Sequence, residues 1–351
     1  MKKVLLSILA VAAMASCVQS EDVNPQQLID FGSPFVGGTT KAIDYSYGAE
    51  NLLKDIYVYG SVTGTSGNPS LVFNHTHVYS EGTTEDTIYN QLWKYDGGPK
   101  YWVPGADYKF VALAGVAETA VTEYALPSVD AYLPSKITFE GDGKTDLLLS
   151  AVSRSNVGAS GNETVAFTMQ HLLSKVKFTV NNTSTLGEDY YKVTNIKITN
   201  AYTEGDCAIS YTGDVDAGTW AATTAWTTDE TAVVNFGHAT ALDAATVGAA
   251  AMNLTAGAKA ASNYDYLVVP YNYSATKMHV SFELALYDKS GVEINSPAEK
   301  TADVVIELKS GYQYNFIINL AFAQAIDFTV TGAPTWSDDT AQSQVVSGTF
   351  N

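Results

Sequence analysis

Two histidines and one run of carboxylates are the side chains in this sequence best suited to binding a metal ion. His75 and His77 flank Thr76, so on a strand both would face the same side, and two imidazoles at that spacing can share a metal. No third ligand lies nearby in the sequence, and we favour an exposed strand face. The run Glu140–Asp146 (EGDGKTD) is rich in oxygen ligands but lacks the regular alternation and the closing glutamate of a calcium loop. We interpret that run as a hairpin turn and predict no metal site and no cofactor.

His171 and Cys207 are the remaining candidates for catalysis, as a general base and as a nucleophile. No serine lies in a nucleophile motif such as G-x-S-x-G that could partner His171. Because His171 precedes a Leu-Leu pair, we expect a structural histidine at a junction between domains. Cys207 lies close to Glu204 and Asp206, and nearby carboxylates raise the pKa of a thiol and lower its reactivity. We therefore predict that the protein is not an enzyme; a hidden carboxylate pair, as in β-sandwich glycosidases, is the least favoured alternative.

The start of the chain has the pattern of a secretory signal peptide. Two lysines precede an uncharged, mostly apolar run over residues 4–13, and small residues follow. The run is too short to cross a bilayer, for which about 20 residues are needed. Cys17 follows two small residues, an arrangement that resembles the lipobox of bacterial lipoproteins. The resemblance implies that residues 1–16 are a lipoprotein signal peptide and that Cys17 carries the lipid; an ordinary signal peptide cut near Ala15 or Ser16 is the alternative.

The chain is strongly acidic. It has 19 Lys and Arg against 37 Asp and Glu, a net charge of −18, and loss of Lys2 and Lys3 with the signal peptide takes the net charge to −20. Such a surface argues against binding to nucleic acid or to anionic lipid headgroups. Arg154 is the only arginine, so a phosphate site built on bidentate guanidinium groups is not expected. The only cysteines are Cys17 and Cys207, and lipidation of the first would exclude an internal disulfide.

Apolar and polar residues alternate with a period of two through much of the sequence. This period places one face of a strand in a core and the other toward water. Weak helix signals and a composition rich in Thr, Val, Tyr, Ala and Gly favour antiparallel β-sandwiches. Lys309–Gly311 predicts a hairpin turn, and the polar stretch 153–162 indicates a seam, with a domain boundary close to His171. The clearest alternating runs are residues 176–180, 278–286, 304–308, 312–320 and 326–330.

Tyrosine is abundant and admits two interpretations. Exposed tyrosines on the loops of a β-sandwich can bind glycans or protein partners. We favour cross-strand pairing, in which the rings pack on neighbouring strands. The tyrosines concerned are Tyr45, Tyr47, Tyr57, Tyr59, Tyr264, Tyr266, Tyr271 and Tyr273.

Three groups of motifs, in this order along the chain, resemble the fimbrillin family, the type V pilin-like surface lipoproteins of Bacteroidales. The second group, which contains the phrase Met169-Gln170-His171-Leu172-Leu173-Ser174-Lys175-Val176, is the most specific. The matches span roughly residues 28–340, most of the chain after the signal peptide. The groups are Gln91–Trp93 with Tyr101–Pro104 and Asp107–Gly115, then Asp146–Ala151 with Val165–Phe178, and last Gly311–Phe316 with Trp336.

The resemblance implies two transthyretin-like antiparallel β-sandwich domains in tandem, over residues 42–170 and 171–351. It also implies that residues 17–41 are a lipidated tether and N-terminal strand, a propeptide that a trypsin-like protease removes from pilin members of the family. Lys41 is the only basic residue between Cys17 and Lys54, so we expect cleavage between Lys41 and Ala42.

The C-terminal tail is the strand that the resemblance assigns to donation into a neighbouring subunit. The apolar residues of Gln342–Asn351 are Val345, Val346 and Phe350, and only Val346 and Phe350 share a face. A strand with two apolar anchors is a modest donor, which leaves a tip subunit or a protein that does not polymerise as alternatives to a stalk subunit.

The sequence therefore predicts a structural, adhesive fimbrial subunit. We expect export as a lipoprotein to the outer membrane and assembly at the cell surface by protease-triggered donor-strand exchange. The expected partners are other fimbrial subunits, in a homo- or heteropolymer, and a host glycan or protein. The alternative is a non-polymerising outer-membrane lipoprotein that binds glycan or host protein.

Overall fold

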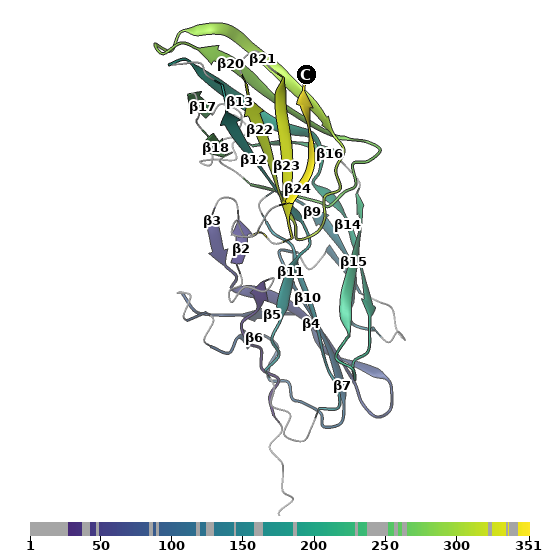
Figure 1. Ribbon diagram of the computed structural model, residues 1–351. Helices are drawn as coiled ribbons and strands as arrows, with labels where there is room; N and C mark the ends of the chain where they lie inside the picture. The colour runs from purple at the N-terminus through teal and green to yellow at the C-terminus, as the bar shows by residue number, and fades with distance from the viewer. Residues whose placement is uncertain are drawn as a thin grey trace, which may run out of the picture.

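The computed structural model describes residues 27–36, 43–46, 49–83, 87–88, 91–116, 120–123, 130–143, 145–157, 164–184, 188–228, 231–236, 252–255, 259–261, 265–321, 325–334, 336 and 343–351. These residues form twenty-four β-strands (Figure 1). The all-β fold class predicted from the sequence is confirmed. Within this part of the chain, no helix has both the length and the apolar character needed to cross a membrane.

The first half of the chain forms a seven-stranded sheet in the order β1-β11-β10-β7-β4-β5-β6. Neighbouring strands are antiparallel except β1 and β11, which pair in parallel. The strands are β1 (Phe35–Val36), β4 (Asp55–Thr63), β5 (Pro69–Tyr79), β6 (Lys94–Tyr95), β7 (Asp107–Ala114), β10 (Leu148–Arg154) and β11 (Thr168–His171).

A four-stranded sheet in the order β15-β14-β9-β8 packs on the seven-stranded sheet. Its strands are β8 (Val121–Glu123), β9 (Pro134–Glu140), β14 (Glu204–Thr212) and β15 (Ala221–Thr228). Tyr59 and Leu113 from one sheet and Ile137 and Ile209 from the other lie in a shared apolar cluster. Strand β14 follows the predicted boundary at His171 yet pairs with β9, which precedes it. The boundary itself stays a prediction, and this antiparallel pairing links the two predicted domains.

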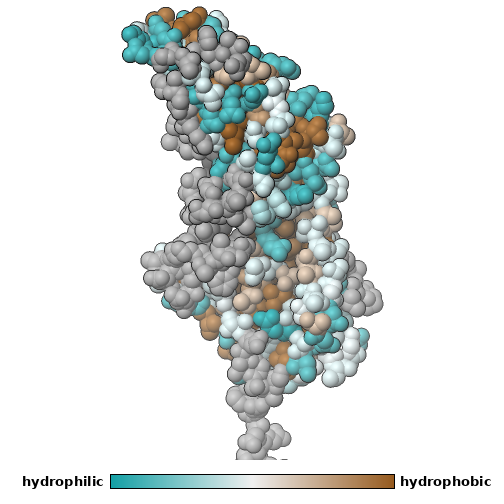
Figure 2. Space-filling view, in the orientation of Figure 1, coloured by the Kyte–Doolittle hydropathy of each residue, from teal (hydrophilic) through white to brown (hydrophobic). Residues whose placement is uncertain are grey.

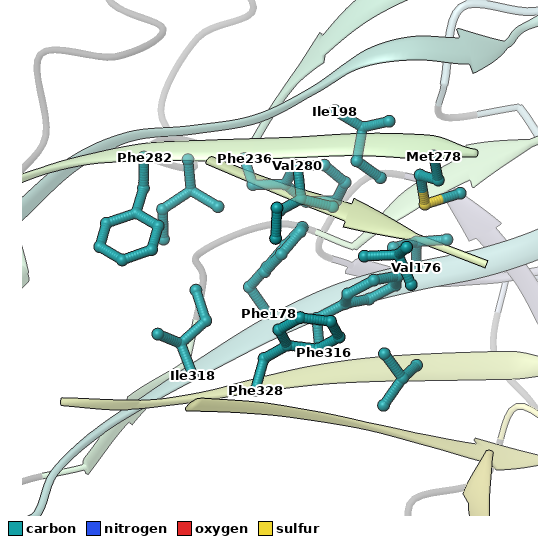
Figure 3. Packing of buried hydrophobic residues seen from close by; sticks show 14 of the residues in the cluster. Val176, Phe178, Ile198, Phe236, Met278, Val280, Phe282, Phe316, Ile318 and Phe328 are labelled. Carbon is teal, nitrogen blue, oxygen red and sulfur yellow. The ribbon is translucent and has the colours of Figure 1, made fainter. Parts of the chain in front are cut away.

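The second half of the chain forms two further sheets that face each other (Figures 1 and 3). One has the order β18-β12-β22-β23-β24 with β19 also paired to β12, and the other has the order β16-β13-β20-β21 with β17 also paired to β13. The first comprises β12 (Ser174–Asn182), β18 (Lys259–Ala261), β19 (Tyr266–Val268), β22 (Gln313–Leu320), β23 (Ile326–Ala333) and β24 (Ser343–Phe350). The second comprises β13 (Tyr190–Tyr202), β16 (Thr231–Asn235), β17 (Met252–Thr255), β20 (Met278–Tyr287) and β21 (Glu293–Val304). A separate hairpin pairs β2 (Ile43–Ser46) with β3 (Ala49–Leu52).

Alternating side chains fill the core between these two sheets (Figure 3). In β20, Met278, Val280 and Phe282 are buried, whereas His279 between them is exposed. Phe178 of β12 and Phe316 of β22 meet them from the facing sheet. The predicted strands over residues 176–180, 278–286, 312–320 and 326–330 are confirmed as parts of β12, β20, β22 and β23. Of the predicted run 304–308, only Val304 lies in a strand.

One parallel pair lies inside the sheet β18-β12-β22-β23-β24. Strands β12 and β22 are parallel neighbours over eight residue pairs, from Lys175↔Gln313 to Asn182↔Leu320. A parallel pair needs a crossover connection, and here most of the C-terminal half lies between the two strands. The prediction of antiparallel sandwiches is therefore correct for most pairs and wrong for this one and for β1 with β11.

Two predicted hairpin turns join strands of different sheets. The segment 140–146 leads from β9 in the four-stranded sheet to β10 in the seven-stranded sheet, and 309–311 leads from β21 to β22 in the facing sheet. Turn geometry is present in both, with φ of 73° at Gly143 and at Gly311. The prediction of hairpins is wrong because turn residues specify that a chain reverses but not which strands then pair.

Candidate functional site

A segment near the N-terminus, Gln27–Pro34, lies in a groove of the first half of the chain and bonds to both of its walls. On one wall, the amide of Ile29 donates to Lys100 O at 2.9 Å and the amide of Trp93 donates to Phe31 O at 2.9 Å. On the other wall, the amide of Gly32 donates to Val165 O at 3.0 Å and the amide of Val165 donates to Asp30 O at 2.8 Å. We call Gln27–Pro34 the N-terminal segment and its site the N-terminal groove. The segment is a strand-like insert with partners on either side.

Alternate side chains of the N-terminal segment fill the floor of the groove. Ile29 and Phe31 are 0% exposed and Ser33 is 5% exposed, whereas Leu28 is 45% exposed. The ring of Phe31 lies at the centre of an aromatic cluster. Its centroid is 5.2 Å from that of Phe73, 5.6 Å from Tyr95, 6.1 Å from Phe110 and 5.8 Å from Phe167.

The N-terminal groove is therefore lined by aromatic rings and by backbone groups that pair with the N-terminal segment. Removal of the segment would uncover the faces of these rings and free the backbone groups of both walls. Sequence reasoning placed an N-terminal strand within residues 17–41 but did not single out Ile29 or Phe31. The alternation Leu28-Ile29-Asp30-Phe31 is the signal that could have found them.

The C-terminal strand β24 lies at the margin of its sheet and pairs with β23, from Ile326↔Phe350 to Gly332↔Ser343. Phe350 is 7% exposed, and its ring lies 4.9 Å from Phe282 and 5.4 Å from Phe328. Val346 packs against the same cluster, as the shared face predicted. Val345 is 46% exposed and lies where the register of β23 and β24 shifts.

Among the described residues, the backbone hydrogen bond on the second side of β24 lies at the end of the strand. The amide of Asn351 donates to Thr301 O of β21 at 2.9 Å. Gly348 lies against the ring of Phe328, and a Cβ at that position would be 2.7 Å from the ring. The inward positions 346, 348 and 350 thus hold a valine, a glycine and a phenylalanine.

His171 lies at a buried contact between the two halves of the chain. Its Nδ1 is 2.5 Å from Asp146 Oδ2, and its ring stacks on Trp336 with centroids 3.7 Å apart. Burial raises the pKa of Asp146, a carboxyl group with no exposed side-chain surface. Lys175 Nζ lies 5.9 Å from the centroid of the Trp336 ring and forms an ion pair with Asp265 at 2.8 Å. This packing agrees with the predicted structural role of His171.

The candidate calcium run, Glu140–Asp146, does not gather its carboxylates. Asp142 accepts hydrogen bonds from the amide of Thr145 at 2.7 Å and from its hydroxyl at 3.0 Å, while Asp146 points to His171. The other candidate ligands, His75 and His77, both stack on Tyr57, with ring centroids 4.3 and 5.4 Å from that of Tyr57. Across the described residues, no group of three His, Cys, Asp or Glu side chains is arranged to hold a metal ion.

Cys207 is a free, buried thiol of β14. Its pKa is raised to about 12, as the sequence predicted in direction, but the cause is burial in the apolar cluster between the sheets. The carboxylate of Asp206 points to the opposite face of the strand, where it binds Lys136 at 3.0 Å and Thr138 at 2.7 Å. The explanation by neighbouring carboxylates is therefore wrong, since successive side chains of a strand point to opposite faces.

The tyrosines pack within the protein more than they line a surface. Tyr59 and Tyr273 are buried, and Tyr57, Tyr266 and Tyr271 are half-buried. Among the other predicted sites, Cys17, Lys41 and Ala42 lie outside the described residues, as do Tyr47 and Tyr264 and the side chain of Tyr45.

The described residues form an all-β fold of stacked sheets, with the N-terminal segment seated in an apolar groove. The family model described as fimbrillin-like matches residues 41–334, most of the sequence. The chain belongs to the fimbrillin-like family.

Two solved structures are similar to this chain at low sequence identity, and the first of them has the same fold. A fimbrial protein from Bacteroides vulgatus ATCC 8482 is 16% identical, with a TM-score of 0.56 over 88% of this chain and 100% of that chain. A fimbrial assembly protein from Parabacteroides distasonis ATCC 8503 is 12% identical, with a TM-score of 0.41 over 91% of this chain and 100% of that chain. No curated protein matches the sequence.

Proposed function

We propose that this protein is a subunit of a cell-surface fimbrium. In this proposal, the N-terminal segment occupies its groove until a strand from another subunit replaces it. Membership of the fimbrillin-like family and likeness to a fimbrial protein support the fimbrial assignment. The single observation that carries the mechanism is the N-terminal segment, paired on both sides and anchored by two fully buried side chains. In the proposed assembly, this segment leaves the groove and a C-terminal strand from another copy replaces it.

The empty N-terminal groove provides the driving force for binding of a replacement strand. Burial of Ile29 and Phe31 contributes about 1.5–3 kcal/mol each, so an empty groove leaves about 3–6 kcal/mol of apolar burial available to a replacement strand. Each backbone hydrogen bond restored along the walls adds about 0.5–1.5 kcal/mol. A strand with the same two-residue period recovers both contributions, less the cost of association and ordering.

The C-terminal strand β24 has the period that this exchange needs. Val346, Gly348 and Phe350 face one side, as Ile29, Phe31 and Ser33 do in the N-terminal segment. In its own sheet β24 pairs along its length with β23 alone among the described strands, so it can leave without separating two other strands. Loss of Phe350 from its own core is compensated by its burial in the groove of the neighbour. With Val345 on the opposite face, the proposed anchors are Val346 and Phe350.

Release of the N-terminal segment is proposed to follow proteolysis. A cut between Lys41 and Ala42 separates residues 17–41, which include the whole N-terminal segment, from the body of the chain. Before that cut, lipidation of Cys17 would hold the precursor at the outer membrane. The lipid is then a temporary tether, and the released subunit associates with other fimbrial subunits.

The test compares two lysines in cells that make the protein. The variant Lys41→Ala should retain the N-terminus at Cys17 and abolish filaments. The variant Lys54→Ala, which alters the next basic residue, exposed in the structure, should leave both unchanged. The mature subunit isolated from wild-type filaments should begin at Ala42.

The outcome that contradicts the proposal is a filament subunit that still begins at Cys17. Deletion of residues 342–351 tests the donor strand separately: filaments should be lost, and unchanged filament length would rule out this role for β24. Wild-type cells that form no filaments and whose subunit keeps its N-terminus at Cys17 would instead favour the alternative, a permanently anchored surface lipoprotein that binds glycan or host protein.

A further inference from the structure

A cavity of about 320 Å³ opens at one end of the core between the two sheets of the C-terminal half. We call it the end cavity. Its volume lies at the lower end of the range for small-molecule sites, about 300–1,000 Å³. Its apolar walls come from β20 on one side and from β22, β23 and β24 on the other, and they include Leu284, Leu286, Leu320, Ile326 and Phe350.

The end cavity exists because the hairpin of β20 and β21 extends past the ends of β22, β23 and β24 (Figure 1). The inner face of β20 is buried as far as Phe282, whereas Leu284 and Leu286, further along the same face, are half-buried. The cover provided by the facing sheet therefore ends after Phe282. Apolar surface continues on the hairpin, where Val292 and Ile294 are 61% and 52% exposed, and hydrophobic surface is visible at this end of the molecule in Figure 2.

The polar groups that line the end cavity are hydrogen-bond donors. They belong to Tyr191, Asn295 and Lys300. Asn295 Oδ1 already accepts a hydrogen bond from the amide of Leu286 at 2.6 Å, which leaves the N–H groups of its side chain to donate. Among the described residues, no carboxylate lines the cavity. In a chain with 37 Asp and Glu against 19 Lys and Arg, such a lining indicates a ligand that supplies acceptors.

Lys300 is the cation of the end cavity. It lies opposite Phe282 in the ladder of β20 and β21, so it shares the inner face of the sheet, and it is half-buried. Its neighbour Glu299 points to the other face, where it forms an ion pair with Lys197 at 3.3 Å. Lys300 itself forms no ion pair with the described residues, in contrast to Lys197. A partly desolvated ammonium group is stabilised by an anion beside it.

Tyr191 is the second group that a ligand would satisfy. Its side chain is 8% exposed, and its hydroxyl has no hydrogen-bond partner among the described residues. Burial raises the pKa of this hydroxyl, so it remains a donor. A buried hydroxyl without a partner is unfavourable, and a ligand acceptor in the cavity removes that cost.

We propose that the end cavity binds the anion of a medium-chain fatty acid, with the alkyl chain on the apolar walls and the carboxylate accepting hydrogen bonds from Lys300 and Tyr191. At about 30 Å³ for each water-sized group, the cavity holds roughly ten non-hydrogen atoms, as many as an octanoate ion has. A small anion such as acetate gains little from the apolar walls and is repelled by the net charge of −18. Apolar walls and a lone cation together therefore select an amphipathic carboxylate.

Binding of this ligand does not depend on fimbrial assembly. Phe350 lines the end cavity only while β24 is paired with β23 in its own sheet. A ligand that binds this arrangement alone stabilises it by mass action, so octanoate should also hold β24 in place.

The experiment uses the full chain with Cys17→Ala, which carries no lipid and needs no detergent that would compete for the cavity. Titration calorimetry should show a single octanoate ion bound per chain. 1-Octanol and octylammonium should bind at least about tenfold more weakly, because neither brings an anion to Lys300. Equal or tighter binding of either compound would overturn the proposal of a carboxylate site. Absence of octanoate binding at every concentration below its micelle point would overturn the cavity as a ligand site.

Matched variants locate the ligand. Lys300→Met keeps the length of the side chain and removes its charge, so it should weaken octanoate binding at least about tenfold and leave 1-octanol binding unchanged. Lys192→Met alters the residue next to Tyr191, on the outer face of β13, and should leave octanoate binding unchanged.

Leu286→Trp should fill the cavity and weaken the binding of both compounds. Thermal midpoints of the three variants close to that of the parent chain show that each is folded. Equal losses of octanoate affinity in Lys300→Met and Lys192→Met, or full affinity in Leu286→Trp, would place the ligand elsewhere and overturn the proposal.

Discussion

Replacement of Phe31 by alanine tests whether the N-terminal segment holds the first half of the chain together. Phe31 is fully buried and packs on four aromatic rings, and truncation of a buried phenylalanine costs about 3–5 kcal/mol. The cavity would lie under a segment tied to the body by backbone hydrogen bonds, so local release of the segment adds to the effect. We expect the free energy of unfolding to fall by about 3–5 kcal/mol in the Phe31→Ala variant.

The assay is urea denaturation followed by tryptophan fluorescence. Trp93 and Trp102 line the groove and are 3% and 4% exposed, so they report on this region. With a slope of about 3 kcal/mol per molar urea, the midpoint should fall by more than about 1 M. Leu28→Ala, on the outward side of the same segment, should change stability by less than about 0.5 kcal/mol. Equal midpoints for Phe31→Ala and Leu28→Ala would refute the assignment of this segment as an anchored insert.

Three further predictions concern the C-terminal strand, the junction and the free thiol. Phe350→Ala should lower the free energy of unfolding by about 3–5 kcal/mol in thermal or urea melts. Val345→Ala, at an exposed position, should change it by less than about 0.5 kcal/mol. Equal effects of the two substitutions would contradict the inward placement of Phe350. Asp146→Ala should lower the free energy of unfolding by about 3–5 kcal/mol, because it removes a buried contact with His171. A decrease below about 1 kcal/mol in the same melts would show that this contact is dispensable. Cys207, with a pKa of about 12, should be about 10⁻⁴ thiolate at pH 8 and react with a thiol reagent only after denaturation; prompt reaction in the folded state would contradict its burial.

Local sequence patterns predicted the strands well. Alternation in residues 278–286 and 326–330 gave both the position of the strand and the face that is buried, because the period of side chains in a strand is fixed at two. The shared face of Val346 and Phe350 followed from the same rule. Motif order in the chain was enough to indicate the fimbrillin family, which the family model confirms.

Partner choice between strands could not be predicted in the same way. The turns at 140–146 and 309–311 were recognised, but each joins strands of different sheets. The parallel pair of β12 and β22 and the pairing of β14 with β9 link residues that lie far apart in sequence. A strand's own alternation is the same whichever neighbour it has, so these pairings depend on how all the strands share the available cores.

By itself, the sequence determined an acidic chain, strands with defined inner faces and the fimbrillin-like family. Tertiary structure alone decided that Ile29 and Phe31 fill a groove built from residues 93–102 and 165–167, and that β15 is the last of the described strands in its sheet. The physical reason is the range of the interactions. Which face of a strand is buried follows from residues two positions apart in the sequence. A groove and a sheet edge exist only after strands that are distant in the sequence have paired.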